Sequence, residues 1–186
     1  MRRSCAEGEN TSLGAGRCLI GSEFVKVLQI NSVYGVGSTG KITQALHTAL
    51  IADGADSIVL YGRGPDADAP GVYRLCRNLY GRANSLLSRL TGLRYGGCNL
   101  ATGKAFRILS KEQPDVVVCT GVLAMIPLCM EAKLSGRKLI YIESFAKVTS
   151  ATLTGKLLYH YADRFYVQWT QMKEIYPDAI CLGGIY

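Results

Sequence analysis

The chain has 186 residues, of which 48% are hydrophobic, and this length and composition suit one globular domain with a sizeable core. The formal net charge is +7, and residues 73–107 hold seven basic and no acidic side chains, which indicates a localised anionic partner. No uncharged run reaches the roughly 18 to 20 apolar residues that a membrane-spanning helix needs, so any membrane contact is expected to be peripheral.

Cysteine and histidine spacing argues against a metal site. The seven cysteines form no CxxC pair and the two histidines, His47 and His160, lie far apart in the sequence, so neither a metal nor another cofactor is expected. Cys119 and Cys129 lie in apolar runs, which fits reduced thiols and a reducing compartment. The basic window carries few aromatic residues and no nucleic-acid-binding motif, so phosphate-rich lipid is favoured over nucleic acid as the anionic partner.

The first 23 residues differ from the rest. Residues 1–23 are rich in glycine, serine and polar groups, without hydrophobic periodicity, and are predicted to form a disordered leader. They lack the apolar core and cleavage pattern of a secretory signal.

Residues 24–54 are predicted to form a strand, a glycine-rich turn and a helix. The strand covers residues 24–31, and apolar residues repeat at helical spacing from Ile42 to Leu50 before Gly54 ends the helix. The glycines let the backbone approach a ligand, and the helix amino terminus offers free N–H groups to an anion. The expected acceptor or phosphate loop consists of Gly35, Gly37, Ser38, Thr39 and Gly40.

The same turn partly fits two nucleotide motifs. A P-loop needs Ser or Thr directly after Lys41, and Ile42 stands there. A dinucleotide site expects an acidic residue after the next strand, whereas residues 57–63 end in Gly62 and Arg63. An arginine there suits a 2′-phosphate, so NADP stays open as an alternative.

Two helices are predicted at residues 78–91 and 96–111. In and just after the first, leucines alternate with arginines, a pattern typical of a helix lying on an anionic membrane, although a core-facing stripe with arginines in water fits equally well. The candidate membrane patch consists of Arg82, Leu86, Leu87, Arg89, Leu90, Leu93 and Arg94.

The second half alternates strands and helices. Three consecutive valines at residues 116–118 predict a strand buried in a parallel sheet, followed by a loop at Thr120 and Gly121 and a helix at residues 123–134. Further strands are expected at residues 137–143 and 164–169, and a short final helix after the second of these. Open α/β sheets bind ligands at the carboxyl ends of their strands, where Glu143 would serve either as a general base or as a residue that orders a loop. His47 and His160 are expected to be structural.

Two family resemblances divide the chain. The strings YIESFAKV, LTGKLLY, FYVQW and LGGIY make residues 114–186 resemble the acceptor-side, membrane-associated subunit of the two-component UDP-N-acetylglucosamine transferase of lipid-linked oligosaccharide synthesis, in its bacterial capsule and exopolysaccharide versions. VLQINSVYGVGSTGKI, LYGRG and GLRYGGCNLATGKAFRIL make residues 24–109 resemble the amino-terminal domain of family-four retaining glycosyltransferases. The seam falls near residues 110–115.

These resemblances imply a single Rossmann-like α/β domain with a mostly parallel sheet over residues 24–186, like the acceptor half of a GT-B glycosyltransferase. They imply a subunit that is inactive alone, with a UDP-sugar-binding catalytic partner, a polyprenyl-pyrophosphate-linked sugar acceptor and a peripheral place at the cytoplasmic face of an anionic membrane. Thr120 and Gly121 would help to form the acceptor cleft. The partner would dock on the tail residues Gly183, Gly184, Ile185 and Tyr186. Two alternatives are a self-contained nucleotide-binding enzyme that uses residues 35–41, and an inert fusion product.

Overall fold

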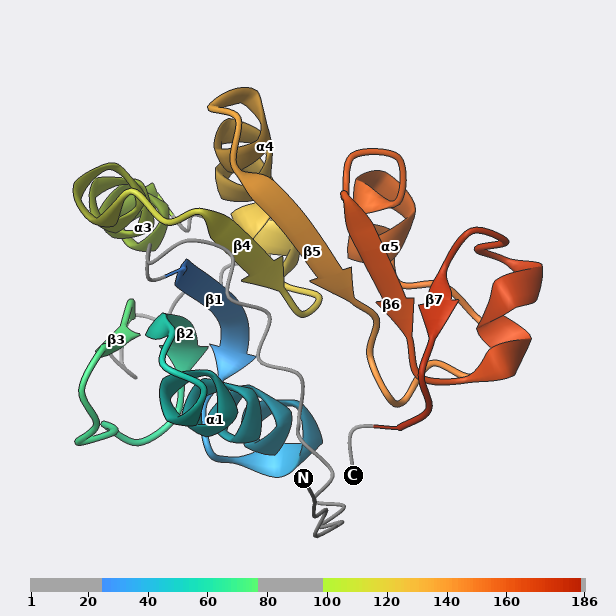
Figure 1. Cartoon of the computed structure of the whole chain (residues 1–186), viewed down its shortest axis with the longest axis horizontal. Coiled ribbons are helices and arrows are strands. Elements are labelled where there is room, and N and C mark those ends of the chain that lie inside the picture. The colour runs from blue at the N-terminus through green and yellow to red at the C-terminus, as the bar shows by residue number, and fades with distance from the viewer. Residues whose placement is uncertain (1–24, 77–98, 185–186) are drawn as a thin grey trace, which may run out of the picture.

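The computed structural model describes residues 25–76 and 99–184, which form one α/β domain around a seven-stranded parallel sheet (Figure 1). The strand order is β3-β2-β1-β4-β5-β6-β7. The strands are β1 (Lys26–Val33), β2 (Asp56–Arg63), β3 (Val72–Arg74), β4 (Val116–Cys119), β5 (Lys138–Ile142), β6 (Arg164–Val167) and β7 (Ile180–Cys181). The helices are α1 (Gly37–Ala52), α3 (Asn99–Glu112), α4 (Ile126–Leu134) and α5 (Leu153–Leu158), with 3-10 turns η1 (Leu123–Met125) and η2 (Thr170–Glu174).

The predicted Rossmann-like fold is confirmed, with differences at the element ends. Helix α1 begins at Gly37, five residues before the apolar repeat that predicted it. The single helix expected at residues 123–134 is divided into η1 and α4, and Pro127 stands in the first turn of α4, where the missing N–H breaks no helical hydrogen bond. The short edge strands β3 and β7 were not predicted. The leader at residues 1–23 and the helix at residues 78–91 lie outside the described residues and stay predictions.

The sheet has two differently covered faces. Val117 of β4 points into a core cluster with Leu109 of α3, Leu128 of α4 and Leu158 of α5, so these three helices cover one face. Val118 points to the other face, as strand periodicity requires, where Leu46 and other residues of α1 pack. Figure 1 shows α1 on the opposite side of the sheet from α3, α4 and α5.

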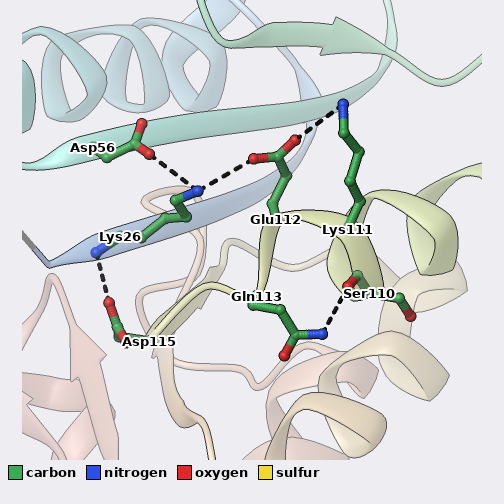
Figure 2. Close-up of polar contacts among 7 residues, drawn as sticks. All are labelled: Lys26, Asp56, Ser110, Lys111, Glu112, Gln113 and Asp115. Carbon is green, nitrogen blue, oxygen red and sulfur yellow. Dashed lines mark hydrogen bonds and ion pairs between the residues drawn. The ribbon is translucent and has the colours of Figure 1, made fainter.

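The junction near residues 110–115 is tied to the first two strands (Figure 2). Lys26 Nζ at the start of β1 lies 3.3 Å from Asp56 Oδ2 at the start of β2 and 3.3 Å from Glu112 Oε2 at the end of α3. Its backbone N–H donates to Asp115 Oδ2 at 2.8 Å, and Val27 of β1 pairs with Val116 of β4. The hydrogen bond to Glu112 raises the pKa of Lys26. Side-chain and backbone bonds therefore join the segment at residues 110–115 to the starts of β1 and β2.

Candidate functional site

The carboxyl ends of β1, β4, β5 and β6 meet at one edge of the sheet, as expected for parallel strands (Figure 1). We call this edge the rim. A small hollow at this edge is lined by residues from α1 and from the loops after β4, β5 and β6. Its lining includes Thr39 and Thr120, which were predicted as site residues, and Glu143, and its remaining residues are Ile42, Ile142, Ser144 and Gln168. The structure therefore brings three of the predicted residues to one place.

The glycines of the first loop have two different structural roles. Gly35 and Gly37 have φ of +67° and +66°, a left-handed conformation that favours glycine. Gly40 lies where α1 meets β1: a Cβ there would stand 3.2 Å from both Gly35 N and Val33 Cγ2. No side chain caps the amino terminus of α1 at Val36, so the turn keeps the arrangement that suits an anion.

Replacing Gly40 by alanine is expected to lower the free energy of unfolding by about 1 to 2 kcal/mol, because the methyl group would press on backbone atoms that cannot move aside easily. The matched control is Gly103→Ala in α3, where nothing lies within 4 Å of the added carbon and alanine should stabilise the helix by about 0.5 to 1 kcal/mol. Urea denaturation of both variants measures the two values. Equal shifts in the same direction would contradict the close packing of Gly40.

Asn31, a residue that the sequence analysis did not single out, holds this loop. Its buried side chain donates from Nδ2 to the Thr39 carbonyl at 2.9 Å and to Thr43 Oγ1. Its Oδ1 accepts the Ser32 N–H at 2.7 Å. An asparagine at the carboxyl end of the predicted strand, directly before the glycine-rich loop, was the signal that could have found it.

The structure also bears on the P-loop alternative. Ile42, in the position where a P-loop has Ser or Thr, is a core residue. Thr43 Oγ1 donates to the Thr39 carbonyl at 3.0 Å and contacts Asn31, so this hydroxyl is engaged inside the protein. Magnesium coordination by this loop would require those bonds to break.

Glu143 is a buried carboxylate surrounded by donors, with 1% of its surface exposed. Oε1 accepts the Ser144 N–H at 2.8 Å and the Tyr141 hydroxyl at 3.5 Å. Oε2 accepts the Thr152 hydroxyl at 3.0 Å, the Thr152 N–H at 3.3 Å and the Tyr176 hydroxyl at 3.4 Å. A buried charge needs such bonds to be stable, and the three from Ser144 and Thr152 hold the segment at residues 144–152 at the end of β5.

Burial and the neighbouring Glu143 carboxylate keep the two tyrosines protonated. Burial raises the pKa of Tyr141 and of Tyr176 above the usual value, and the negative charge of Glu143 raises both further. The Tyr176 hydroxyl lies 3.4 Å from the carboxylate, whereas the Tyr141 hydroxyl lies closer to Thr152 Oγ1, at 3.0 Å, than to Glu143. This arrangement is typical of a residue that orders a loop, one of the two roles predicted for Glu143. The general-base role stays a prediction.

Gly155 in α5 is required by the same cluster. A Cβ at this position would lie 2.3 Å from Glu143 Oε2, 2.6 Å from the Tyr176 hydroxyl and 3.0 Å from Thr152 Oγ1. Thr152 caps α5 by accepting the Gly155 N–H at 2.9 Å. The absence of a side chain at Gly155 therefore lets α5 approach the carboxylate, which sequence reasoning did not foresee.

The second predicted loop, after β4, is braced by neighbouring elements. Thr120 Oγ1 donates to the Ile30 carbonyl of β1 at 3.3 Å. Gly121 has φ of +83°, and its carbonyl accepts the Thr154 hydroxyl of α5 at 3.5 Å. The loop thus connects β1 with α5 below the rim, and its predicted part in the acceptor cleft is not tested by these contacts.

His47 lies in the core and has the structural role that was expected. Its Nδ1 is 2.8 Å from Ser57 Oγ, which also accepts Gln29 Nε2–H at 3.2 Å, so the serine hydroxyl donates to a neutral imidazole. Burial lowers the pKa of His47, and a hydrogen bond to the Pro70 backbone opposes part of this shift.

The lowered pKa of His47 predicts a pH-dependent stability. The pKa of His47 in the folded state lies below its value of about 6.5 in the unfolded chain. At a pH between these two values, the unfolded state binds a proton that the folded state does not. The stability that the neutral imidazole provides is therefore complete above about pH 6.5 and declines below it. Urea denaturation at pH 7.5 and 6.0 should therefore give a lower free energy of unfolding at pH 6.0, and His47→Gln should reduce that difference. His160→Gln, at an exposed position, should keep it. An unchanged difference in His47→Gln would contradict the assignment.

The carboxyl-terminal tail lies beside the rim and a larger groove. A Cβ on Gly184 would stand 3.3 Å from the ring of Phe145, whose carbonyl accepts Trp169 Nε1–H at 2.7 Å. A groove of about 400 Å³ runs from the tail over the sheet face that carries α1, and we call it the sheet-face groove. It is lined mainly by apolar side chains, among them Leu46, Val118, Ile140, Ile142, Tyr166 and Leu182.

Other predicted residues are placed as follows. Gly183, with φ of +91°, lines the sheet-face groove, whereas Ile185 and Tyr186 lie outside the described residues. The membrane patch of residues 82–94 also lies outside them. Across residues 25–76 and 99–184, no helix is long and apolar enough to span a bilayer, and no cluster of three metal-ligating side chains occurs.

Comparison with protein families gives a match over the second half. Residues 96–185 match the model described as oligosaccharide biosynthesis protein Alg14 like. The human UDP-N-acetylglucosamine transferase subunit ALG14 is 38% identical over 87 residues, which are 44% of this chain and 40% of that protein. The subunit of the same name from Schizosaccharomyces pombe is 40% identical over 75 residues, covering 38% of this chain and 36% of the relative. The chain thus spans about two fifths of the length of these relatives.

Solved structures match the fold over most of the chain. MurG from Acinetobacter baumannii superposes with a TM-score of 0.52 at 18% identity, covering 77% of this chain and 41% of that protein. UDP-N-acetylglucosamine 2-epimerase from Rickettsia bellii gives a TM-score of 0.52 at 12% identity, covering 82% and 41%. The chain therefore has the fold of about half of a GT-B-type protein, and its residues 96–185 form an Alg14-like sequence.

Proposed function

We propose that the chain is the acceptor-side subunit of a two-subunit UDP-N-acetylglucosamine transferase in lipid-linked oligosaccharide synthesis. The observation that carries the proposal is the position of the Alg14-like sequence. It covers β4 to β7 and α5, the elements that hold Glu143, Gly155 and most of the rim. The named relatives come from human and yeast, and they give no support to the narrower capsule or exopolysaccharide version.

The fold is compatible with a function that requires a partner. In GT-B enzymes the reaction takes place between two Rossmann-like domains, one that holds the acceptor and one that holds the sugar nucleotide. The described residues form one such domain, with its rim at the carboxyl ends of the strands. A UDP-sugar-binding catalytic subunit would supply the facing wall and the donor.

The sheet-face groove is the proposed docking place for that partner. Parallel sheets are normally covered on both faces, and here the face over β4, β5 and β6 leaves an apolar groove. The groove continues into Leu182 and Gly183 of the tail, the part that the family resemblance assigns to partner docking, and Leu182 is 81% exposed. An apolar element of the UDP-sugar-binding subunit fits such a surface.

Leu182→Glu is expected to weaken the complex by at least about tenfold, because a charge would enter an apolar contact near the centre of the proposed interface. Leu134→Glu is the matched control: Leu134 is 80% exposed, and its helix α4 covers the other face. Affinity is measured by titration of the purified chain with the UDP-sugar-binding subunit. Equal binding by the two variants would place the interface elsewhere.

The acceptor is proposed to be a polyprenyl-pyrophosphate-linked sugar held at the rim. The first turn of α1, with Gly35, Gly37, Ser38 and Thr39 before and within it, suits a pyrophosphate, because its N–H groups point outward without a side-chain cap. The hollow beside Thr120 and Glu143 would then lie next to the sugar. A peripheral position at the cytoplasmic face of the membrane completes the proposal.

The alternatives make different predictions for the isolated chain. A self-contained nucleotide-binding enzyme would bind UDP-sugars, NADP or ATP tightly without a partner, as isothermal titration would show. An inert fusion product would bind neither nucleotide nor partner. The proposed subunit binds the partner and performs no transfer alone.

A further inference from the structure

The segment that contains α5 combines exposed apolar side chains with an absence of acidic ones. Residues 144–162 contain Lys147, Lys156 and His160 and no aspartate or glutamate. Within this segment, side chains that would ordinarily be buried stand partly in solvent. Val148 is 37% exposed, Leu153 48%, Leu157 47% and Tyr161 48%. We call these four residues, with Lys147 and Lys156, the α5 surface.

The exposure follows from how α5 packs. Thr154, Gly155 and Leu158 are buried against the sheet and the Glu143 cluster, so Leu153 and Leu157 are left on the outer side. These two leucines are four residues apart, a spacing that places them next to each other on one helix face. The turn continues beyond the helix, since the Tyr161 N–H donates to the Leu158 carbonyl at 3.0 Å.

The cations of the α5 surface are not neutralised by neighbouring carboxylates. Lys147 Nζ donates to Ser150 Oγ at 3.3 Å, and neither Lys147 nor Lys156 forms an ion pair within the described residues. The nearby Asp163 is paired with Lys133 at 2.7 Å. Asp178 accepts the Tyr159 hydroxyl at 3.3 Å. The local charge is therefore positive around an apolar centre.

We propose that the α5 surface docks on an anionic lipid bilayer. Leucine, valine and tyrosine side chains enter the boundary between headgroups and acyl chains, and lysines beside them bind lipid phosphates, which is the pattern of interfacial membrane contacts. The two lysines, and the lack of aspartate and glutamate within residues 144–162, favour an anionic lipid surface over an acidic-rimmed protein partner. This assigns membrane contact to residues other than the arginine patch predicted from the sequence.

Docking through α5 would also place the rim near the membrane. Residues 144–152 leave β5 at the rim and lead into α5, and three hydrogen bonds to Glu143 from Ser144 and Thr152 fix this connection. A rigid connection would hold the acceptor site close to the bilayer that carries its substrate. The placement of the acceptor site close to its substrate rests on the proposed function, whereas binding of the chain to a membrane is measured without any transfer reaction.

The test is vesicle co-sedimentation of the full chain. Wild-type protein should bind vesicles of phosphatidylglycerol and phosphatidylcholine, and binding should weaken at high salt or with phosphatidylcholine alone. The double variant Leu153→Gln, Leu157→Gln should bind at least about tenfold more weakly, because two partly exposed leucines lose their contact with the acyl boundary. Ile51→Gln, with 49% exposure on α1, is the matched control and should bind as wild type.

A second double variant tests the proposal even if the leucine double variant does not fold. Lys147→Glu, Lys156→Glu reverses two solvent-accessible charges and should also reduce binding while the thermal transition stays that of wild type. The proposal is overturned if wild-type protein does not bind, if both double variants bind normally, or if Ile51→Gln loses binding equally. Loss of binding only in Arg82→Glu, Arg89→Glu, Arg94→Glu would assign the contact to the sequence-predicted patch instead.

A separate readout distinguishes this inference from the proposed function. In a complex with the UDP-sugar-binding subunit, the leucine double variant should transfer sugar to a short-chain, water-soluble pyrophosphate acceptor as well as wild type. No transfer by either complex would count against the proposed function. The vesicle result would still decide whether the α5 surface binds lipid.

Discussion

Replacing Gly155 by alanine is expected to lower the free energy of unfolding by about 3 kcal/mol, one of the largest effects of a single methyl group in this chain. The added carbon would lie 2.3 Å from Glu143 Oε2 and 2.6 Å from the Tyr176 hydroxyl. Either α5 must move away from β5 or the carboxylate must leave its donors, and both outcomes disturb buried hydrogen bonds. Urea denaturation measures the loss.

A double-mutant cycle makes this prediction specific to the carboxylate. In a Glu143→Ala background the nearest atom to the added carbon is absent, so Gly155→Ala should cost less there than in the wild-type chain. Gly103→Ala should have the same small effect in both backgrounds, because nothing lies near that position. Additive effects of Glu143→Ala and Gly155→Ala would contradict the contact.

Replacing Glu143 by glutamine is expected to cost about 2 to 4 kcal/mol of stability. Glutamine has nearly the same size, but in either orientation its NH₂ group would face a backbone N–H, that of Ser144 or that of Thr152, which cannot accept a hydrogen bond. A buried donor would then meet another donor without an acceptor. Glu174→Gln, at an exposed position, should change stability by less than about 0.5 kcal/mol.

The same variant separates the two roles predicted for Glu143. If the residue orders the loop at residues 144–152, Glu143→Gln should lose transfer activity in a reconstituted complex mainly through unfolding, with activity recovering at low temperature. If it is also the general base, kcat should stay low even where the variant is fully folded. Wild-type stability together with full activity would contradict both roles.

The parts of the fold that sequence predicted well are those where a local pattern reports burial. The unbroken apolar run of β4 marks a strand covered on both sides, and Gly54 and Gly136 mark helix ends. Strands β3 and β7 have three and two residues, too few for a pattern, and their pairing with β2 and β6 defines them. Their positions depend on tertiary contacts that a single sequence does not display.

The sequence predicted the location of the candidate site better than the chemical role of its residues. The ends of β1, β4 and β5 indicated the rim, and Glu143 stood out as a carboxylate after an apolar strand. Its main distant partner, Tyr176, lies 33 residues further along, and no local pattern links the two. The sequence therefore suggested a carboxylate facing a cleft, whereas the structure shows that most of its lone pairs are occupied by donors.

The junction between the two family resemblances is compatible with a single folded domain. Lys26 connects the starts of β1 and β2 with the end of α3, and four consecutive residue pairs join β1 to β4 in register (Figure 2). These contacts are the ones that a parallel sheet requires between its halves. The predicted change of family near residues 110–115 is therefore compatible with one continuous sheet, and it stays a prediction.

The most direct measurement is sugar transfer from UDP-N-acetylglucosamine to a polyprenyl-pyrophosphate-linked acceptor by the purified chain, with and without the UDP-sugar-binding subunit. The chain alone should show no transfer, and addition of the partner should produce it, with Leu182→Glu requiring more partner than Leu134→Glu. Transfer by the chain alone would contradict the account.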